Sequence, residues 1–223
     1  MTPAEPEESG RGRDRALAFS DGVFAIAITL LVLNLKTPHV SGPNTGGKLL
    51  DALGNERGVL IGFAISFYVI ARFWLTHHRL SLRLRRVDGR FLVTNLLLLA
   101  FIVFLPFPTE LLGLYGGTTA AVVLYAGTMV CVAGLSLVLW EYARRTHLMA
   151  PMSAAELREN HERAVVPVVV FAISIPLAFA STTAAQLSWV LLVAVYLFRR
   201  TAVWRGPRPR ARESNPRSHA SGS

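Results

Sequence analysis

One carboxylate lies inside an otherwise apolar stretch near the start of the chain. Residues 15–35 read RALAFSDGVFAIAITLLVLNL, and an aliphatic run follows directly after Asp21 and a glycine. An ionisable side chain in such a run is costly in a membrane, and it usually faces a bundle interior or a water-filled path where it has a partner. Asp21 can therefore do one of two things: exchange a proton, or hold neighbouring helices together through hydrogen bonds.

On a helix, Asp21 is separated from the longest apolar stripe of the same segment. At about 100° per residue, Ile26, Leu30 and Leu33 fall within about 60° of one another. Thr29 lies at the edge of this stripe. Asp21 lies about 120° to 140° away from Ile26 and Leu33, so the carboxylate and the stripe face different surroundings.

Possible partners for Asp21 lie near the end of the second apolar segment. That segment ends in ARFWLTHHR. If it runs antiparallel to the first helix, four of its side chains lie at about the depth of Asp21: Arg72, Trp74, His77 and His78. The carboxylate is then paired, and the pattern favours a packing latch whose buried hydrogen bonds fix the first helix. Because two adjacent histidines diverge by about 100° on a helix, they cannot both face one metal ion.

Motifs typical of intramembrane enzymes are absent from the sequence. The apolar segments contain no H-E-x-x-H pair, no G-x-S-x-G elbow, no Walker loop and no acidic dyad. The single cysteine, Cys131, excludes an intrachain disulfide and any site built from several cysteines. We therefore expect no catalytic residues, no bound metal and no cofactor.

Composition predicts a polytopic all-α membrane protein. The chain has 223 residues, of which 52% are hydrophobic and only 17% charged. A helix needs about 20 apolar residues to cross a bilayer. Six stretches approach that length: 16–35, 58–75, 91–114, 118–140, 164–180 and 181–198. The last two nearly abut and should form one helical hairpin.

Lys and Arg residues predict the orientation of these helices, because cytoplasmic flanks carry the excess. Arginines gather in the N-terminal arm, in the second and fourth connections and in the tail, whereas Lys36, Lys48 and Arg57 fall on the other side. Both termini are therefore predicted to be cytoplasmic. The domains expected are a basic cytoplasmic arm at 1–15, a six-helix unit at 16–204 and a disordered basic tail at 205–223.

The same distribution argues against nucleic-acid binding, despite a net charge of +9. A basic face that binds phosphates would cluster on one folded surface, whereas these charges alternate with membrane crossings. Attraction of the basic tail to anionic lipid is an option. Membrane lipid is thus an expected partner and nucleic acid is not.

The motif in the first segment resembles the transmembrane protein 175 family of potassium channels. RALAFSD fits R-x-x-x-F-S-D, and GVFAIAITLLVL continues the likeness. SFYVIARFWLTHHRL in the second segment and NLLLLAFIVFLPFPTELLG in the third are also similar to prokaryotic members. The likeness spans nearly the whole chain, and its first-helix motif is specific.

This resemblance implies a potassium-selective cation channel that conducts passively and lacks the T-V-G-Y-G filter. A chain with one six-helix repeat would form a homotetramer, with the pore lined by the first helix of each of four subunits. When the residues are matched to the family by their distance from the F-S-D motif, the resemblance implies four pore-lining positions: Ile26, Thr29, Leu30 and Leu33. The aliphatic rings would form a hydrophobic constriction able to gate by dewetting, and Thr29 would supply a hydroxyl layer.

The resemblance also implies a network that supports the pore. Its expected members are Arg15, Phe19, Ser20 and Asp21 on the first helix, with Trp74 and His77 on the second. The expected location is the plasma membrane of a prokaryotic cell, with potassium as the permeating ion.

Two alternatives remain open. A proton- or cation-coupled secondary transporter could use Asp21 as its coupling site, although no pair of interrupted helices in repeated halves is visible and Asp21 lies off the stripe. A non-conducting membrane scaffold would leave the polar residues of the first helix unexplained.

Overall fold

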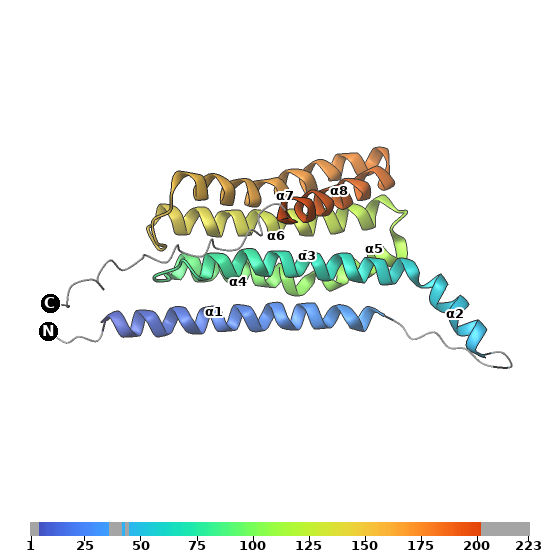
Figure 1. Cartoon of the computed structure of the whole chain (residues 1–223), viewed down its shortest axis with the longest axis horizontal. Helices are drawn as coiled ribbons and strands as arrows, with labels where there is room; N and C mark the ends of the chain where they lie inside the picture. Colours follow the sequence, from blue (N-terminus) through green and yellow to red (C-terminus); the bar gives the residue numbers. More distant parts are fainter. Residues whose placement is uncertain (1–4, 36–41, 43–44, 202–223) are drawn as a thin grey trace, which may run out of the picture.

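The computed structural model describes residues 5–35, 42 and 45–201, and within these ranges every regular element is a helix (Figure 1). In chain order the elements are α1 (Glu5–Leu30), η1 (Leu31–Asn34), α2 (Thr45–Asn55), α3 (Arg57–Ser81), α4 (Gly89–Phe104), α5 (Pro106–Tyr115), α6 (Thr119–Arg145), α7 (Ala154–Ala180) and α8 (Thr182–Thr201). The predicted all-α class is confirmed. The tail predicted at 205–223 lies outside the described residues.

Five helical stretches in the described part of the chain are long and apolar enough to cross a membrane. They are Gly10–Leu33, Gly58–Ser81, Gly89–Tyr115, Thr119–Arg145 and Ala154–Ala180. The sixth predicted segment is α8, which turns back at Ser181 and packs along α7 as the expected hairpin (Figure 1). The chain is therefore a multi-pass membrane protein.

The first helix begins earlier than its apolar run. The sequence predicts a start near residue 16, but α1 already begins at Glu5 and continues without a break into the apolar run. Glutamate and arginine are good helix formers, so the polar arm extends the helix readily. Arg13 Nη1 also donates to the carbonyl of Leu84 at 3.1 Å, which ties the arm to the α3–α4 connection.

The third predicted segment is one span made of two helices. α4 ends at Phe104 and α5 begins at Pro106, with the amide of Leu105 bonded to the carbonyl of Ile102 three residues back. Pro106 and Pro108 have no N–H to continue the ladder, which explains the interruption. The helix resumes at once, because Thr109 N–H donates to the Leu105 carbonyl at 3.1 Å.

The subunit has two halves. In the first half α1 lies at the edge and packs on α3 and α4, with α5 continuing from α4 (Figure 1). The second half consists of α6, α7 and α8, and α6 meets the first half mainly through α4 and α5. One continuous core joins the halves, from Phe24 and Ile70 to Met129 and Phe171.

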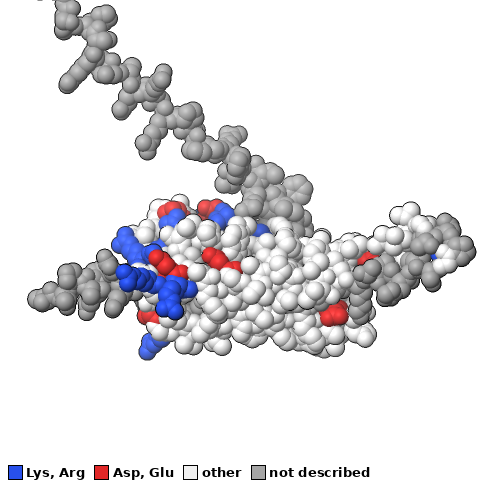
Figure 2. Space-filling view, turned by 90° about the horizontal axis from the view of Figure 1, so that it is seen from below, with Lys and Arg blue, Asp and Glu red and all other residues white. Residues whose placement is uncertain are grey.

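Charged residues gather at one end of the bundle, where the α3–α4 and α6–α7 connections lie (Figure 2). The two connections meet in a short antiparallel bridge between Leu84 and Met149. Asp88 caps α4 by accepting from the amide of Phe91 at 2.8 Å, and it accepts a second bond from the hydroxyl of Tyr142 at 2.7 Å. Burial alone would raise the pKa of Asp88, but these hydrogen bonds and the charge of Arg90 outweigh it and lower the pKa.

Candidate functional site

The inner face of α1 is a narrow buried stripe. Ser20, Phe24, Ala27 and Leu31 recur at helical spacing, and each is at most 1% exposed. This stripe faces α3 and α4, and the small side chain of Ala27 lets the helices approach closely. α1 is therefore held along one line only.

The opposite face of α1 is uncovered in the single chain. Ile26 is 57% exposed, Thr29 is exposed as well, and Leu30 is partly buried. Leu33, 72% exposed, lies beyond the end of α1 in the short 3-10 helix η1, where the sequence predicts that the first helix continues. Thr29 donates its hydroxyl proton to the carbonyl of Ile26 at 2.8 Å, so its oxygen can still accept a hydrogen bond. The four residues predicted to line a pore thus lie together beside an open surface, and their role stays a prediction.

Ser20 is part of a buried chain of hydrogen bonds across three helices. Asn95 on α4 donates its amide to Ser20 Oγ at 2.9 Å, and its carbonyl oxygen lies 2.8 Å from Nε2 of His77 on α3. Since an amide oxygen only accepts, Nε2 of His77 carries the proton in this arrangement. Ser20 in turn donates to the carbonyl of Ala16 at 2.9 Å. The chain Ser20–Asn95–His77 therefore fixes the rotation of α1 against both of its neighbours.

Sequence reasoning missed Asn95. It is an amide in an apolar segment, the same kind of signal that drew attention to Asp21, but it carries no charge. All three members of the chain are at most 5% exposed, and the ring of Phe24 packs beside His77 at a centroid distance of 5.5 Å. Nδ1 of His77 is buried without a hydrogen-bond partner among the described residues. Breaking one of these buried hydrogen bonds should cost more than breaking a bond at the surface, because the group left unpaired cannot bond to water instead.

A second link joins α1 to α3. Nε1 of Trp74 donates to Oδ1 of Asp21 at 2.9 Å, in an exposed position. The indole also stacks on His78, with ring centroids 5.2 Å apart and an interplanar angle of 21°. The structure thus brings Asp21 to one of the side chains expected at its depth, and the stacked histidine fixes the orientation of the donor.

Two predicted network residues lie elsewhere on α1. Arg15 and Phe19 are exposed, and Phe19 is 56% exposed. At about 100° per residue, Arg15 lies about 140° from Ser20, on the side of α1 that the single chain leaves open. They are therefore placed to meet something outside this chain rather than to bond with α3 or α4.

Metal binding has no support in the described part of the chain, where no group of three or more His, Cys, Asp or Glu side chains is placed to hold an ion. What the arrangement provides is mechanical. In the described part of the chain, polar links at Arg13, Ser20 and Asp21 hold α1, while its other face remains available to water, lipid or another subunit.

Comparison with known proteins gives these features a context. Residues 15–106 match the sequence profile of the family described as "Endosomal/lysosomal potassium channel TMEM175". A protein of Streptomyces collinus named as a potassium channel is 35% identical over 202 residues, covering 88% of this chain and 95% of the relative. One from Chamaesiphon minutus, also named as a potassium channel, is 41% identical over 160 residues, covering 70% of this chain and 75% of the relative.

A solved structure has the same fold. The crystal structure of a lysosomal potassium-selective channel TMEM175 homologue from Chamaesiphon minutus superimposes with a TM-score of 0.72 at 31% identity. The match covers 85% of this chain and 98% of that one.

Proposed function

The chain belongs to the TMEM175 family, and on that premise we propose that it is a potassium-selective cation channel that conducts passively. This chain matches most of the length of the Streptomyces and Chamaesiphon relatives. Both are named as potassium channels, and neither is named as an enzyme. The observation that carries the proposal is the uncovered face of α1, which lies opposite the buried links to α3 and α4.

One α1 helix cannot enclose a path for ions, but four can surround an axis. In the proposed homotetramer each α1 turns its open face to the axis, and the lining residues are Ile26, Thr29, Leu30 and Leu33. An apolar ring conducts only when wetted, so the aliphatic positions form the constriction and the gate. Thr29 adds a ring of hydroxyl oxygens that can replace part of the hydration shell of an ion.

The supporting network acts on this pore from behind. Rotation of α1 by even one residue position would turn the proposed rings away from the axis by about 100°. Ser20, Asn95 and His77 oppose that rotation on the buried side, and Asp21 and Trp74 oppose it nearer the surface. In the tetramer, Arg15 and Phe19 would contact a neighbouring subunit from the open side of α1.

Both termini are proposed to be cytoplasmic, in the plasma membrane of a prokaryotic cell. Support comes from the arginines at the end of the bundle where the α3–α4 and α6–α7 connections meet. In a Cys131→Ser background, a cysteine replacing Lys48 should react with an impermeant thiol reagent from outside intact cells, and one replacing Arg85 should not. The opposite labelling pattern would reject this orientation.

Recordings from purified protein in planar bilayers test the pore. Ile26→Ala and Leu33→Ala should raise the current and weaken the preference for potassium over sodium, because each change removes apolar groups from all four subunits at one ring. Thr29→Val should alter selectivity more than assembly. Ile173→Ala on α7 is the matched control, since Ile173 is 60% exposed and lies far along the chain from α1. Unchanged conductance and selectivity in all three α1 variants would reject the pore assignment.

Coupled transport through Asp21 is the second candidate, and the exposure of this carboxylate favours it. The bond to Trp74 favours the supporting role instead, since a proton carrier must release its partner in each cycle. Liposome flux separates the two: a voltage-driven potassium flux without proton exchange supports the channel. Saturable exchange that Asp21→Asn abolishes would support the transporter.

A further inference from the structure

A cleft runs between α3 and the second half of the subunit, and it consists of two adjoining cavities. The inner one has a volume of about 390 Å³ and the outer one about 480 Å³. Their walls share Thr76, Ser136, Arg163 and Ala164. The two cavities therefore meet along one stretch of α3, α6 and α7, and a single elongated molecule can occupy both.

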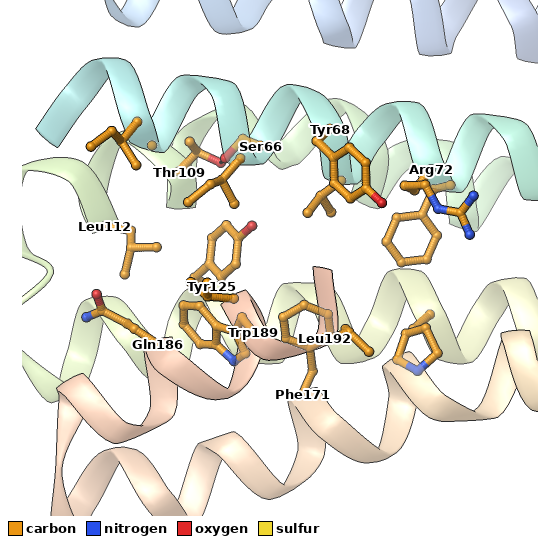
Figure 3. Close-up of a pocket in the computed structure, with 18 of the residues that line it drawn as sticks. Ser66, Tyr68, Arg72, Thr109, Leu112, Tyr125, Phe171, Gln186, Trp189 and Leu192 are labelled. Atoms are coloured by element: carbon orange, nitrogen blue, oxygen red, sulfur yellow. The ribbon is translucent and has the colours of Figure 1, made fainter. Parts of the chain in front are cut away.

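Aromatic rings form one wall of the inner cavity (Figure 3). Tyr125 of α6, Phe171 of α7 and Trp189 of α8 pack on one another, with centroid distances of 5.1 Å from Tyr125 to Trp189 and 5.8 Å from Phe171 to Trp189. Ser66 and Thr109 on the opposite wall bond to each other at 3.2 Å, so they satisfy their own polar atoms. The volume lies in the range of about 300 to 1,000 Å³ typical of small-molecule sites, and the lining suits an acyl chain.

Charged side chains line the outer cavity. Arg79 enters from α3, Arg83 from the α3–α4 connection and Arg163 from α7. Arg83 Nη2 lies 2.7 Å from Glu156, and Arg163 pairs with Glu159. Three guanidinium groups thus share a wall with two carboxylates, and the balance is positive. A basic pocket between membrane helices is the setting in which anionic headgroups bind.

We propose that this cleft binds an anionic phospholipid, with the headgroup phosphate beside Arg79 and Arg163 and one acyl chain along Phe171 and Trp189. The headgroup would lie at the end of the bundle with the loop connections, and the acyl chain would follow the aromatic wall deeper in the cleft, past Arg72, which also lines the inner cavity. A soluble anion would leave the inner cavity unused, and a zwitterionic headgroup would bring a cation to a wall lined by more arginines than carboxylates. The cleft also touches α3 at Thr76, next to His77, so the lipid lies against the helix that holds α1.

The test uses the full chain, purified in detergent and depleted of lipid. Phosphatidylglycerol brominated on its acyl chains is titrated in, because bromine quenches tryptophan fluorescence on contact. We expect saturable quenching, and Trp189→Phe should remove most of it. Unbrominated phosphatidylglycerol should reverse the quenching at least tenfold more effectively than phosphatidylcholine with the same acyl chains.

Two variants test the two ends of the site separately. Arg79→Gln should weaken binding about tenfold or more, and Arg145→Gln is its control, because Arg145 is a 73% exposed cation at the same end of the bundle that does not line the cleft. Gly62→Leu should fill the inner cavity and weaken binding to a similar degree. A Cβ at Gly62 would meet no atom within 4 Å, so this variant should fold normally, which its melting temperature without lipid will verify.

The proposal is overturned by any of four results. These are equal competition by phosphatidylcholine, equal quenching in Trp189→Phe, full competition by glycerol 3-phosphate without acyl chains, and parental affinity in either cleft variant. None of these results depends on conduction, so a failed lipid site leaves the channel proposal untouched, and the reverse also holds.

Discussion

The two halves of the subunit use polar side chains in different ways. In the middle of α1, α3, α4 and α5, polar groups bond from one helix to another, as in Ser20–Asn95, Asn95–His77 and Ser66–Thr109. In α6 and α7 the buried hydroxyls of Thr128 and Ser174 bond carbonyls of their own helices. There the rings of Tyr125, Phe171 and Trp189 pack between the helices, and the hydroxyl of Thr119 near the end of α6 reaches the carbonyl of Ala178 only at 3.5 Å.

The difference shows two ways to hold helices together in lipid. Burying apolar surface against lipid tails yields little, because the tails are as apolar as the side chains. Packing of large rings then fixes distance, whereas a hydrogen bond between helices also fixes rotation. The helix whose rotation matters most for the proposed pore, α1, has the polar links. The family profile covers residues 15–106, which spans α1 to α4 and ends where α5 begins.

The largest effect is expected in the ring-packed half. Phe171→Ala removes about 100 Å³ of side chain, and at about 24 cal/mol per Å³ of residual cavity the free energy of unfolding should fall by about 2 kcal/mol. Melting of the detergent-solubilised protein measures this, with Phe179→Ala, 73% exposed on the same helix, as a near-neutral control. Selectivity of the remaining channels should not change. A changed reversal potential would contradict the distinction between the two halves, because ring packing would then also determine the selectivity of the pore.

A somewhat smaller loss of stability is expected at Asn95, but with a different consequence. Asn95→Leu removes the donor to Ser20 and the acceptor for His77, at roughly 1 to 2 kcal/mol in total for two links between membrane helices. Because α1 loses its buried rotational restraint, current per assembled channel and potassium preference should also fall.

Thr128→Val is the matched change for Asn95 in the other half. It removes a buried hydroxyl that bonds only the carbonyl of Leu124 in its own helix, so stability and conduction should both stay close to the parent. If Thr128→Val proves as damaging as Asn95→Leu, the distinction between bonds within and between helices does not hold.

The exposed link should matter less than the buried one. Trp74→Phe removes the donor to Asp21 but keeps a ring that can stack on His78, so the loss should be about 0.6 kcal/mol, the average for such bonds. Thermal melting in detergent, compared with Asn95→Leu, gives the order. A larger loss for Trp74→Phe would place the main restraint on α1 at the surface instead.

A smaller effect again is expected where the two halves meet at the charged end of the bundle, at Asp88 and Tyr142. The pKa of Asp88 is lowered in the folded chain, so its carboxylate stabilises the fold above the ordinary pKa of 3.8, and this contribution is lost as the pH falls through the folded pKa. Solvent screening limits it to roughly 0.5 kcal/mol. The difference in melting temperature between the parent and Asp88→Asn should be constant from about pH 5 to 8 and should shrink once the pH falls below 3.8 toward the lowered pKa of the folded chain. A difference that grows as the pH falls would contradict this sign.

Hydropathy was sufficient to predict the helical class, five of the six spans and the α7–α8 hairpin, because the bilayer imposes length and apolarity on each segment. It placed the start of α1 near residue 16, since the polar arm that extends the helix to Glu5 has no apolar signal. The interruption at Leu105 was visible in two prolines, yet apolarity across them suggested one helix.

The candidate site was predictable only in part. A charge inside an apolar run is conspicuous, so Asp21 and its neighbourhood on α3 were found. Asn95 was not found, because its role depends on the two side chains to which it bonds, and these come from distant parts of the sequence. The proposed lining residues depend on an axis that lies outside any one subunit, so no single chain can establish them.

The unbroken length of α1 has a mechanical consequence. Twenty-six helical residues rise about 39 Å, more than the roughly 30 Å of the hydrocarbon layer, so part of the rod projects beyond the membrane. A rigid rod transmits torque along its axis, and no break separates the arm from the stripe at Ile26. A twist applied at Arg13, where the arm is tied to the α3–α4 connection, therefore loads the links at Ser20 and Asp21 before it can turn the stripe.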